Sequence, residues 1–200
     1  VKAGAAEADA LILDLEDSVA PDRKDEARVA VAAFLRQPRA RPMLVRINPL
    51  GSGLAEGDLA AVLPARPDGL VLPKAEGAAS VEALATDLPV LPVATETPAA
   101  VFQLGSYAAV SRRLLGLTWG AEDLPAAMGA STSREADGNF TAPYQLARSL
   151  TLFGAHAANV AAIETVYPDF RDLAGLTAYA ARGRRDGFVG MMAIHPAQVS

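Results

Sequence analysis

Short apolar runs alternate with amphipathic or alanine-rich stretches along the whole chain. The apolar runs are rich in valine, leucine and isoleucine and are bounded by turn residues, which is the pattern of strands buried on both faces of a sheet. They lie at residues 10–16, 43–47, 69–73, 90–96, 114–119, 159–164 and 191–194. The stretches between them predict helices at residues 22–37, 54–64, 77–87, 142–158 and 169–187. This alternation indicates an α/β fold with a parallel sheet.

Polar side chains follow every predicted strand at its carboxyl end. They include Asp14, Glu16, Arg46, Lys74, Glu96, Glu122, Asp123, Glu164 and His195. In an open sheet functional groups gather at one switch point, whereas in a (β/α)₈ barrel the carboxyl ends of all strands face one mouth. The pattern therefore favours a TIM barrel.

A complete TIM barrel has eight strands and typically about 250 residues. The sequence has 200 residues and predicts one strand fewer. We therefore expect residues 1–200 to form a single TIM-barrel domain that is incomplete at both ends, lacking strand 1 and the C-terminal helix or tail.

Composition excludes several classes of function. The net charge is −5 and there is no polybasic tract, so nucleic acid is not an expected partner. The absence of cysteine excludes disulfides, thiolate zinc sites and a cysteine nucleophile. No apolar run approaches the roughly 20 residues of a membrane helix, and a cytoplasmic location is compatible with this composition.

The sequence "LILDLEDSV" ends a buried strand in acid. Asp14, Glu16 and Asp17 place three carboxylates within four positions. Carboxylates crowded near a core must be neutralised, pair with cations or bind a metal. Arg46, in "LVRIN", either neutralises these acids or binds a substrate carboxylate through two guanidinium N–H groups, and both interpretations stay open.

Two more acids are candidates for a metal site. Glu96 in "VATETP" and Asp123 in "WGAEDLP" could simply favour helix N-termini, but acids at barrel strand ends are typical of functional sites. Mg²⁺ is usually held by one or two carboxylates together with waters and substrate. Backbone N–H groups from Gly120 through Ala121 and Glu122 could also receive a substrate carboxylate.

Lys74, in "LPKAE", admits two interpretations. A lysine at a barrel strand end can form a Schiff base. Nearby carboxylates would instead keep the amine protonated, which favours an electrostatic or substrate-binding role. No nucleophile elbow, phosphate-binding loop or zincin motif occurs.

Six motifs in order resemble one known family. They are "ADALILDLEDSVAPDRKDEAR", "VRIN", "GLVLPKAE", "TETP", "GAEDL" and "GFVGMMAIHPAQV". Together they resemble the citrate lyase β-subunit-like branch of the HpcH/HpaI aldolase superfamily. The resemblance implies a TIM barrel, a Mg²⁺ cofactor, and a homotrimer or hexamer. It also implies cleavage or formation of a carbon–carbon bond in citryl-, malyl- or citramalyl-type thioesters of CoA or an acyl carrier, with a small keto acid as the other product.

Site roles follow from the same resemblance. Glu96 and Asp123 match the metal ligands, and Arg46 matches the group that binds substrate and stabilises the enolate. Glu16 and Asp17 match acids that support the metal and Arg46 during catalysis. Glu164 stands where relatives often have aspartate and receives no role, and the general base is expected outside these residues. The alternatives are a Mg²⁺-dependent pyruvate-type aldolase acting on free hydroxy-keto acids and a metabolite-binding barrel without catalysis.

Overall fold

Parallel strands form the centre of the molecule. The computed structural model describes residues 7–199. Its strands are β1 (Leu11–Asp14), β2 (Met43–Arg46), β3 (Gly69–Leu72), β4 (Val90–Pro92), β5 (Gly116–Thr118), β6 (Ala161–Glu164) and β7 (Gly190–Met191). Each overlaps one of the predicted apolar runs and is shorter than it, and β7 begins one residue before its run and shares only Met191 with it.

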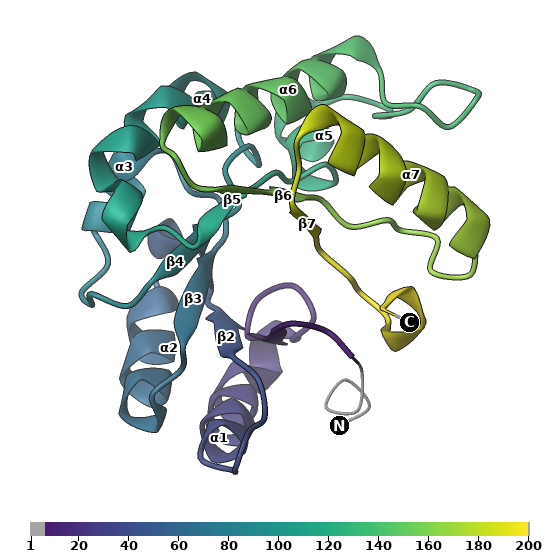
Figure 1. Cartoon of the computed structure of the whole chain (residues 1–200). Helices are drawn as coiled ribbons and strands as arrows, with labels where there is room; N and C mark the ends of the chain where they lie inside the picture. Colours follow the sequence, from purple (N-terminus) through teal and green to yellow (C-terminus); the bar gives the residue numbers. More distant parts are fainter. Residues whose placement is uncertain (1–6, 200) are drawn as a thin grey trace.

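The strands follow one another in sequence order around a curved surface. The order is β1-β2-β3-β4 in one sheet and β5-β6-β7 in the other, and every pairing is parallel. Two parallel bridges, Val90 with Leu114 and Val93 with Thr118, connect the two sheets between β4 and β5. Figure 1 shows the resulting arc of strands with helices on its outside. This confirms the predicted α/β barrel architecture; within residues 7–199, β1 pairs only with β2 and β7 only with β6.

Seven α-helices cover the outer face of the described barrel. They are α1 (Lys24–Leu35), α2 (Ala55–Val62), α3 (Ala78–Glu82), α4 (Pro98–Gln103), α5 (Asp123–Met128), α6 (Ala142–Ala157) and α7 (Leu173–Asp186). The five predicted helices are all present. The helices α4 and α5 and the 3₁₀ segment Leu104–Arg113 were not among the predicted helices. The two α-helices have six residues each, too few to show a 3.6-residue period, and only the acids near their starts suggested helix N-termini.

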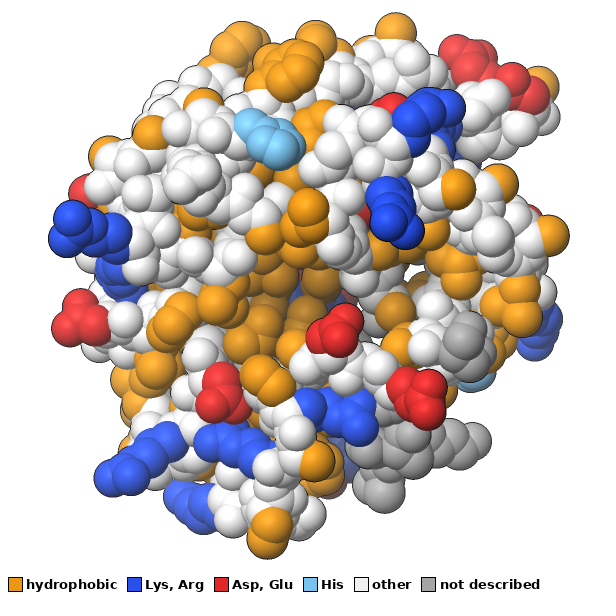
Figure 2. Space-filling model, viewed as in Figure 1, with side chains coloured by type: hydrophobic (Ala, Val, Ile, Leu, Met, Phe, Trp, Pro, Cys, Tyr) orange, Lys and Arg blue, Asp and Glu red, His pale blue; other side chains and the backbone are white. Residues whose placement is uncertain are grey.

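The strands are buried on both faces, as a barrel requires. Leu70 and Leu72 of β3 pack into the large core between strands and helices. Val71, between them, packs with Leu44 and Leu91 in a second cluster on the opposite face. On the side shown in Figure 2, hydrophobic side chains gather in a central recess, with charged side chains mainly around it. No helix in residues 7–199 is long and apolar enough to cross a membrane.

Candidate metal and substrate site

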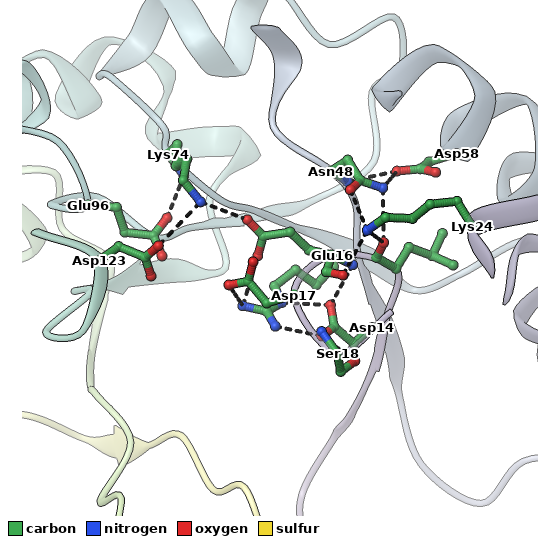
Figure 3. A network of polar contacts seen from close by, with 12 residues as sticks. Asp14, Glu16, Asp17, Ser18, Lys24, Asn48, Asp58, Lys74, Glu96 and Asp123 are labelled. Carbon is green, nitrogen blue, oxygen red and sulfur yellow. Dashed lines mark hydrogen bonds and ion pairs between the residues drawn. The ribbon is translucent and has the colours of Figure 1, made fainter. Parts of the chain in front are cut away.

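Charged side chains from five neighbouring strand ends meet in one network. Figure 3 shows the part of it that runs from the loop after β1 to the start of α5. The members are Asp14, Glu16, Asp17, Arg46, Lys74, Glu96 and Asp123, all of them predicted from the sequence to lie at strand ends. The barrel therefore brings together residues that are far apart along the chain.

Arg46 is bound to Asp14 through both branches of its guanidinium. These residues are register partners across β1 and β2, and the two contacts are Nε to Oδ1 at 2.7 Å and Nη2 to Oδ2 at 2.6 Å. Burial alone would raise the pKa of Asp14, but its hydrogen bonds to Arg46 and Ser18 lower it to about 2. Nε and Nη2 of Arg46 therefore both bind Asp14, and Nη1 is the guanidinium nitrogen that can contact other groups.

Glu16 links the two cations of the site. Its side chain is buried, with Oε2 2.9 Å from Nη1 of Arg46 and Oε1 3.0 Å from Nζ of Lys74. Burial raises the pKa of Glu16, and the two cations oppose that rise. Asp17 lies at the exposed edge, 4.0 Å from Arg46. Of the two predicted supporting acids, Glu16 makes the closer contact.

Lys74 contacts acids on both sides. Nζ lies 3.4 Å from Asp123, and the backbone N–H donates to Glu96 Oε2 at 2.5 Å. Its φ of 50° is uncommon for a residue other than glycine. Burial alone would lower the pKa of Lys74, but Glu16, Asp123 and Glu96 together hold it well above the ordinary value. A protonated ammonium is a poor nucleophile, so this geometry supports the electrostatic interpretation over the Schiff base.

Glu96 and Asp123 lie side by side (Figure 3). Glu96 is only 4% exposed, and Asp123 is the first residue of α5. Burial, with the charges of Asp123 and Glu16, raises the pKa of Glu96 to about 8. The Lys74 ammonium contacts Asp123, whereas Glu96 accepts a hydrogen bond from the neutral backbone N–H of Lys74. The negative charge of the two carboxylates is therefore only partly balanced by this lysine.

A divalent cation fits this donor set. Among the described residues no group of three or more histidine, cysteine, aspartate or glutamate side chains is arranged to enclose a metal. A cation bound between Glu96 and Asp123 would therefore complete its coordination with water or substrate oxygens. Two carboxylates with open positions are the donor set that Mg²⁺ prefers over zinc.

Gly120 lies against the Glu96 side chain, and its N–H has a partner within the protein. Its N–H donates to Thr95 Oγ1 at 3.2 Å and is already satisfied, so the structure does not present this amide to a substrate. A Cβ on Gly120 would lie 2.3 Å from Cγ of Glu96, closer than carbon atoms can approach. Gly120 therefore makes room for the Glu96 side chain. Ala121 is buried, and Glu122 is half exposed with its carboxylate 3.8 Å from Arg134.

We expect Gly120→Ala to weaken Mg²⁺ binding by about tenfold or more, because the added methyl group must displace the Glu96 carboxylate. Titration of the metal-free protein by calorimetry measures this. Gly105→Ala is the matched control, since a Cβ there meets no atom within 4 Å. Equal affinity in the two variants would contradict the role given to Gly120.

Sequence reasoning gave no role to Glu164, which the structure places in a second buried network. Oε1 accepts hydrogen bonds from Trp119 Nε1 and Tyr179 Oη, and Oε2 accepts from Arg148 Nε at 2.7 Å. Arg148 also reaches Asp186 at 2.8 Å. This network connects β6, α6 and α7 to Trp119, the residue before Gly120. The only signal in the sequence was an acid at the carboxyl end of an apolar run.

The chain matches one known family over almost its whole length. The family described as HpcH/HpaI aldolase/citrate lyase matches residues 1–196. A (3S)-malyl-CoA thioesterase of Cereibacter sphaeroides is 35% identical over 202 residues, covering 99% of this chain and 69% of the relative. The mitochondrial citramalyl-CoA lyase of Homo sapiens is 32% identical, covering 96% of this chain and 62% of the relative.

A solved structure shares the fold over almost the whole chain. It is the protein CitE of Mycobacterium tuberculosis in complex with magnesium, acetoacetate and coenzyme A. The TM-score is 0.86 at 36% identity, with 99% of this chain and 71% of that chain covered. The family match covers residues 1–196, and the fold is shared with a solved structure over 99% of the chain. The chain therefore belongs to the HpcH/HpaI aldolase/citrate lyase family of enzymes.

Proposed function

We propose that this protein is a Mg²⁺-dependent lyase that cleaves or forms a carbon–carbon bond in a β-hydroxyacyl thioester. Citryl-, malyl- or citramalyl-CoA are the substrates that we infer, with a keto acid and an acetyl-CoA-like product. The observation that carries the proposal is the pair Glu96 and Asp123, two adjacent carboxylates at the mouth of the barrel. Asp123 lies 3.4 Å from the Lys74 ammonium, whereas Glu96 is buried and accepts a hydrogen bond from the Lys74 backbone N–H. Magnesium, acetoacetate and coenzyme A in the CitE structure support this choice of ligands.

Each residue of the network contributes to this chemistry. Bound between Glu96 and Asp123, Mg²⁺ would supply a Lewis acid for the substrate's carboxylate and its α-oxygen. Arg46 Nη1 and the ammonium of Lys74 face the same mouth and would stabilise the negative oxygen that develops as the carbon–carbon bond breaks. Glu16 holds both of these cations through its two carboxylate oxygens. The base that removes the hydroxyl proton is not assigned to a residue of this chain.

The proposal also covers the thioester carrier, the domain organisation, the oligomeric state and the location of the protein. We infer a CoA thioester rather than an acyl-carrier thioester, because relatives of this chain are a malyl-CoA thioesterase and a citramalyl-CoA lyase. One barrel domain across residues 1–200, a homotrimer or hexamer, and a cytoplasmic location stay predictions.

Thioester hydrolysis is a second candidate function, favoured by the thioesterase among the relatives. It differs from the lyase reaction in its products, since hydrolysis releases free CoA and an intact hydroxy acid. The pyruvate-type aldolase alternative would turn over free hydroxy-keto acids, and a non-catalytic barrel would bind keto acid without turnover.

A product assay tests the proposal. The full-length protein is incubated with citryl-, malyl- and citramalyl-CoA, with Mg²⁺ and after EDTA treatment, and both keto acid and free thiol are measured. We expect keto acid without an equal release of free CoA, and loss of turnover after chelation. Free CoA without keto acid would select hydrolysis, and full activity after complete chelation would refute the metal site.

A further inference from the structure

A buried lysine lies directly behind the site, on the outer side of the barrel. Lys24, in the first turn of α1, is only 9% exposed. Its ammonium donates to the backbone oxygens of Leu15 at 2.7 Å and Glu16 at 2.8 Å, and to Asn48 Oδ1 at 2.8 Å. All three of its N–H bonds therefore end on the loops that follow β1 and β2 (Figure 3).

Asn48 connects this lysine to α2. It is 3% exposed, its Nδ2 donates to Leu15 O at 2.9 Å and Asp58 Oδ2 at 2.7 Å, and its own N–H also donates to Asp58 Oδ2 at 2.7 Å. The other oxygen of Asp58 accepts from Arg28 Nε at 2.8 Å. Each donor and acceptor of the Asn48 amide has a partner, so the network fixes the orientation of its side chain.

The acceptors around the Lys24 ammonium are neutral oxygens. Burying an ammonium on neutral groups is less favourable for stability than packing an apolar side chain of similar size in the same space. The interaction instead fixes the position of the backbone at Glu16. Lys24 holds the carbonyl of Glu16, while the N–H of Glu16 donates to Asp14 Oδ1 at 2.9 Å. The backbone of Glu16 is thus held from both sides.

We propose that Lys24, acting with Asn48, is a positioning residue for the site. It holds Glu16 where its carboxylate contacts both Arg46, at 2.9 Å, and Lys74, at 3.0 Å. If Glu16 moves away, Lys74 keeps Asp123 as a carboxylate partner, 3.4 Å from its ammonium, and competes with a cation for it. The effect on metal affinity rests on the proposed function, whereas the effect on the Glu16 loop does not.

Two methionine variants on the same helix separate positioning from general stability. Lys24→Met removes the ammonium under the Glu16 loop. Arg28→Met, the control, removes another largely buried cation of the network. Arg28 contacts Asp25, Asp58 and the backbone oxygen of Leu54, and none of these lies in the loop after β1. Hydrogen exchange measures the amides of residues 15–19, and Mn²⁺ titration followed by electron paramagnetic resonance measures metal affinity in the full-length protein.

We expect Lys24→Met to speed exchange in residues 15–19 by about tenfold over both wild type and Arg28→Met, and to weaken Mn²⁺ binding by about tenfold. Equal exchange in the two variants, or no greater loss of affinity in Lys24→Met than in Arg28→Met, overturns the proposal. If Lys24→Met does not fold, Asn48→Ala replaces it with the same outcomes, because it removes one anchor of Leu15 and one acceptor of Lys24. If the wild type binds no Mn²⁺, the proposed function fails while the exchange comparison still decides the positioning role.

Discussion

We expect Glu96→Gln and Asp123→Asn each to lower metal affinity and the rate of thioester cleavage by more than about 100-fold. Each would remove one of the two anionic ligands that we propose, and loss of groups outside the ligand shell already costs about 10–100-fold in comparable sites. Calorimetric titration with Mg²⁺ and the keto acid assay measure the two effects. Glu82→Gln on α3 is the matched control, since it changes the same functional group at an exposed position outside the network.

A second measurement distinguishes loss of a ligand from loss of the fold. Burial raises the pKa of Glu96 to about 8, so its ionised form destabilises the metal-free protein increasingly as the pH rises from about 4.5 to 8. A neutral glutamine removes that charge, and we expect the metal-free variant to have a melting temperature at pH 8 at least equal to that of wild type. Near-normal turnover by either variant, or loss of binding accompanied by unfolding, would contradict the assignment of these residues as metal ligands.

Arg148→Met has the largest expected effect on stability, a loss of about 3–5 kcal/mol in the free energy of unfolding. The substitution leaves the Glu164 carboxylate, which is 1% exposed, without its cationic partner in the core between β5, β6 and α7. Urea denaturation followed by circular dichroism measures the change. A loss below about 1 kcal/mol would show that the buried pair does not hold this part of the barrel together.

Two further variants sharpen that test. Arg185→Met removes an exposed arginine of α7 that pairs with Asp186 at 3.1 Å, and surface pairs of this kind contribute at most about 1 kcal/mol. Adding Glu164→Gln to Arg148→Met removes the uncompensated charge. We expect this double variant to be more stable than Arg148→Met alone, because the penalty comes from the unpaired carboxylate rather than from the lost contact.

The sequence by itself determined the strands and the side of the barrel on which the chemistry lies. Runs such as residues 69–73 are apolar on both faces, and only a strand covered on both sides can bury them. The polar residue that follows each run must lie at its carboxyl end, and parallel pairing brings those ends to one mouth. Lys74, Glu96 and Asp123 could therefore be grouped as a candidate site before any tertiary contact was known.

The ion-pair partner of each charged side chain, and the need for a small residue at a given position, became known only from the tertiary structure. Arg46 was free to bind several acids, but the register of β1 and β2 places Asp14 directly opposite it. The need for glycine at position 120 comes from Glu96, which is 24 residues earlier in the chain. These choices depend on the distances between side chains that come from separate strands. Periodicity along one chain carries no such information, because it specifies which face a residue occupies but not what lies across from it.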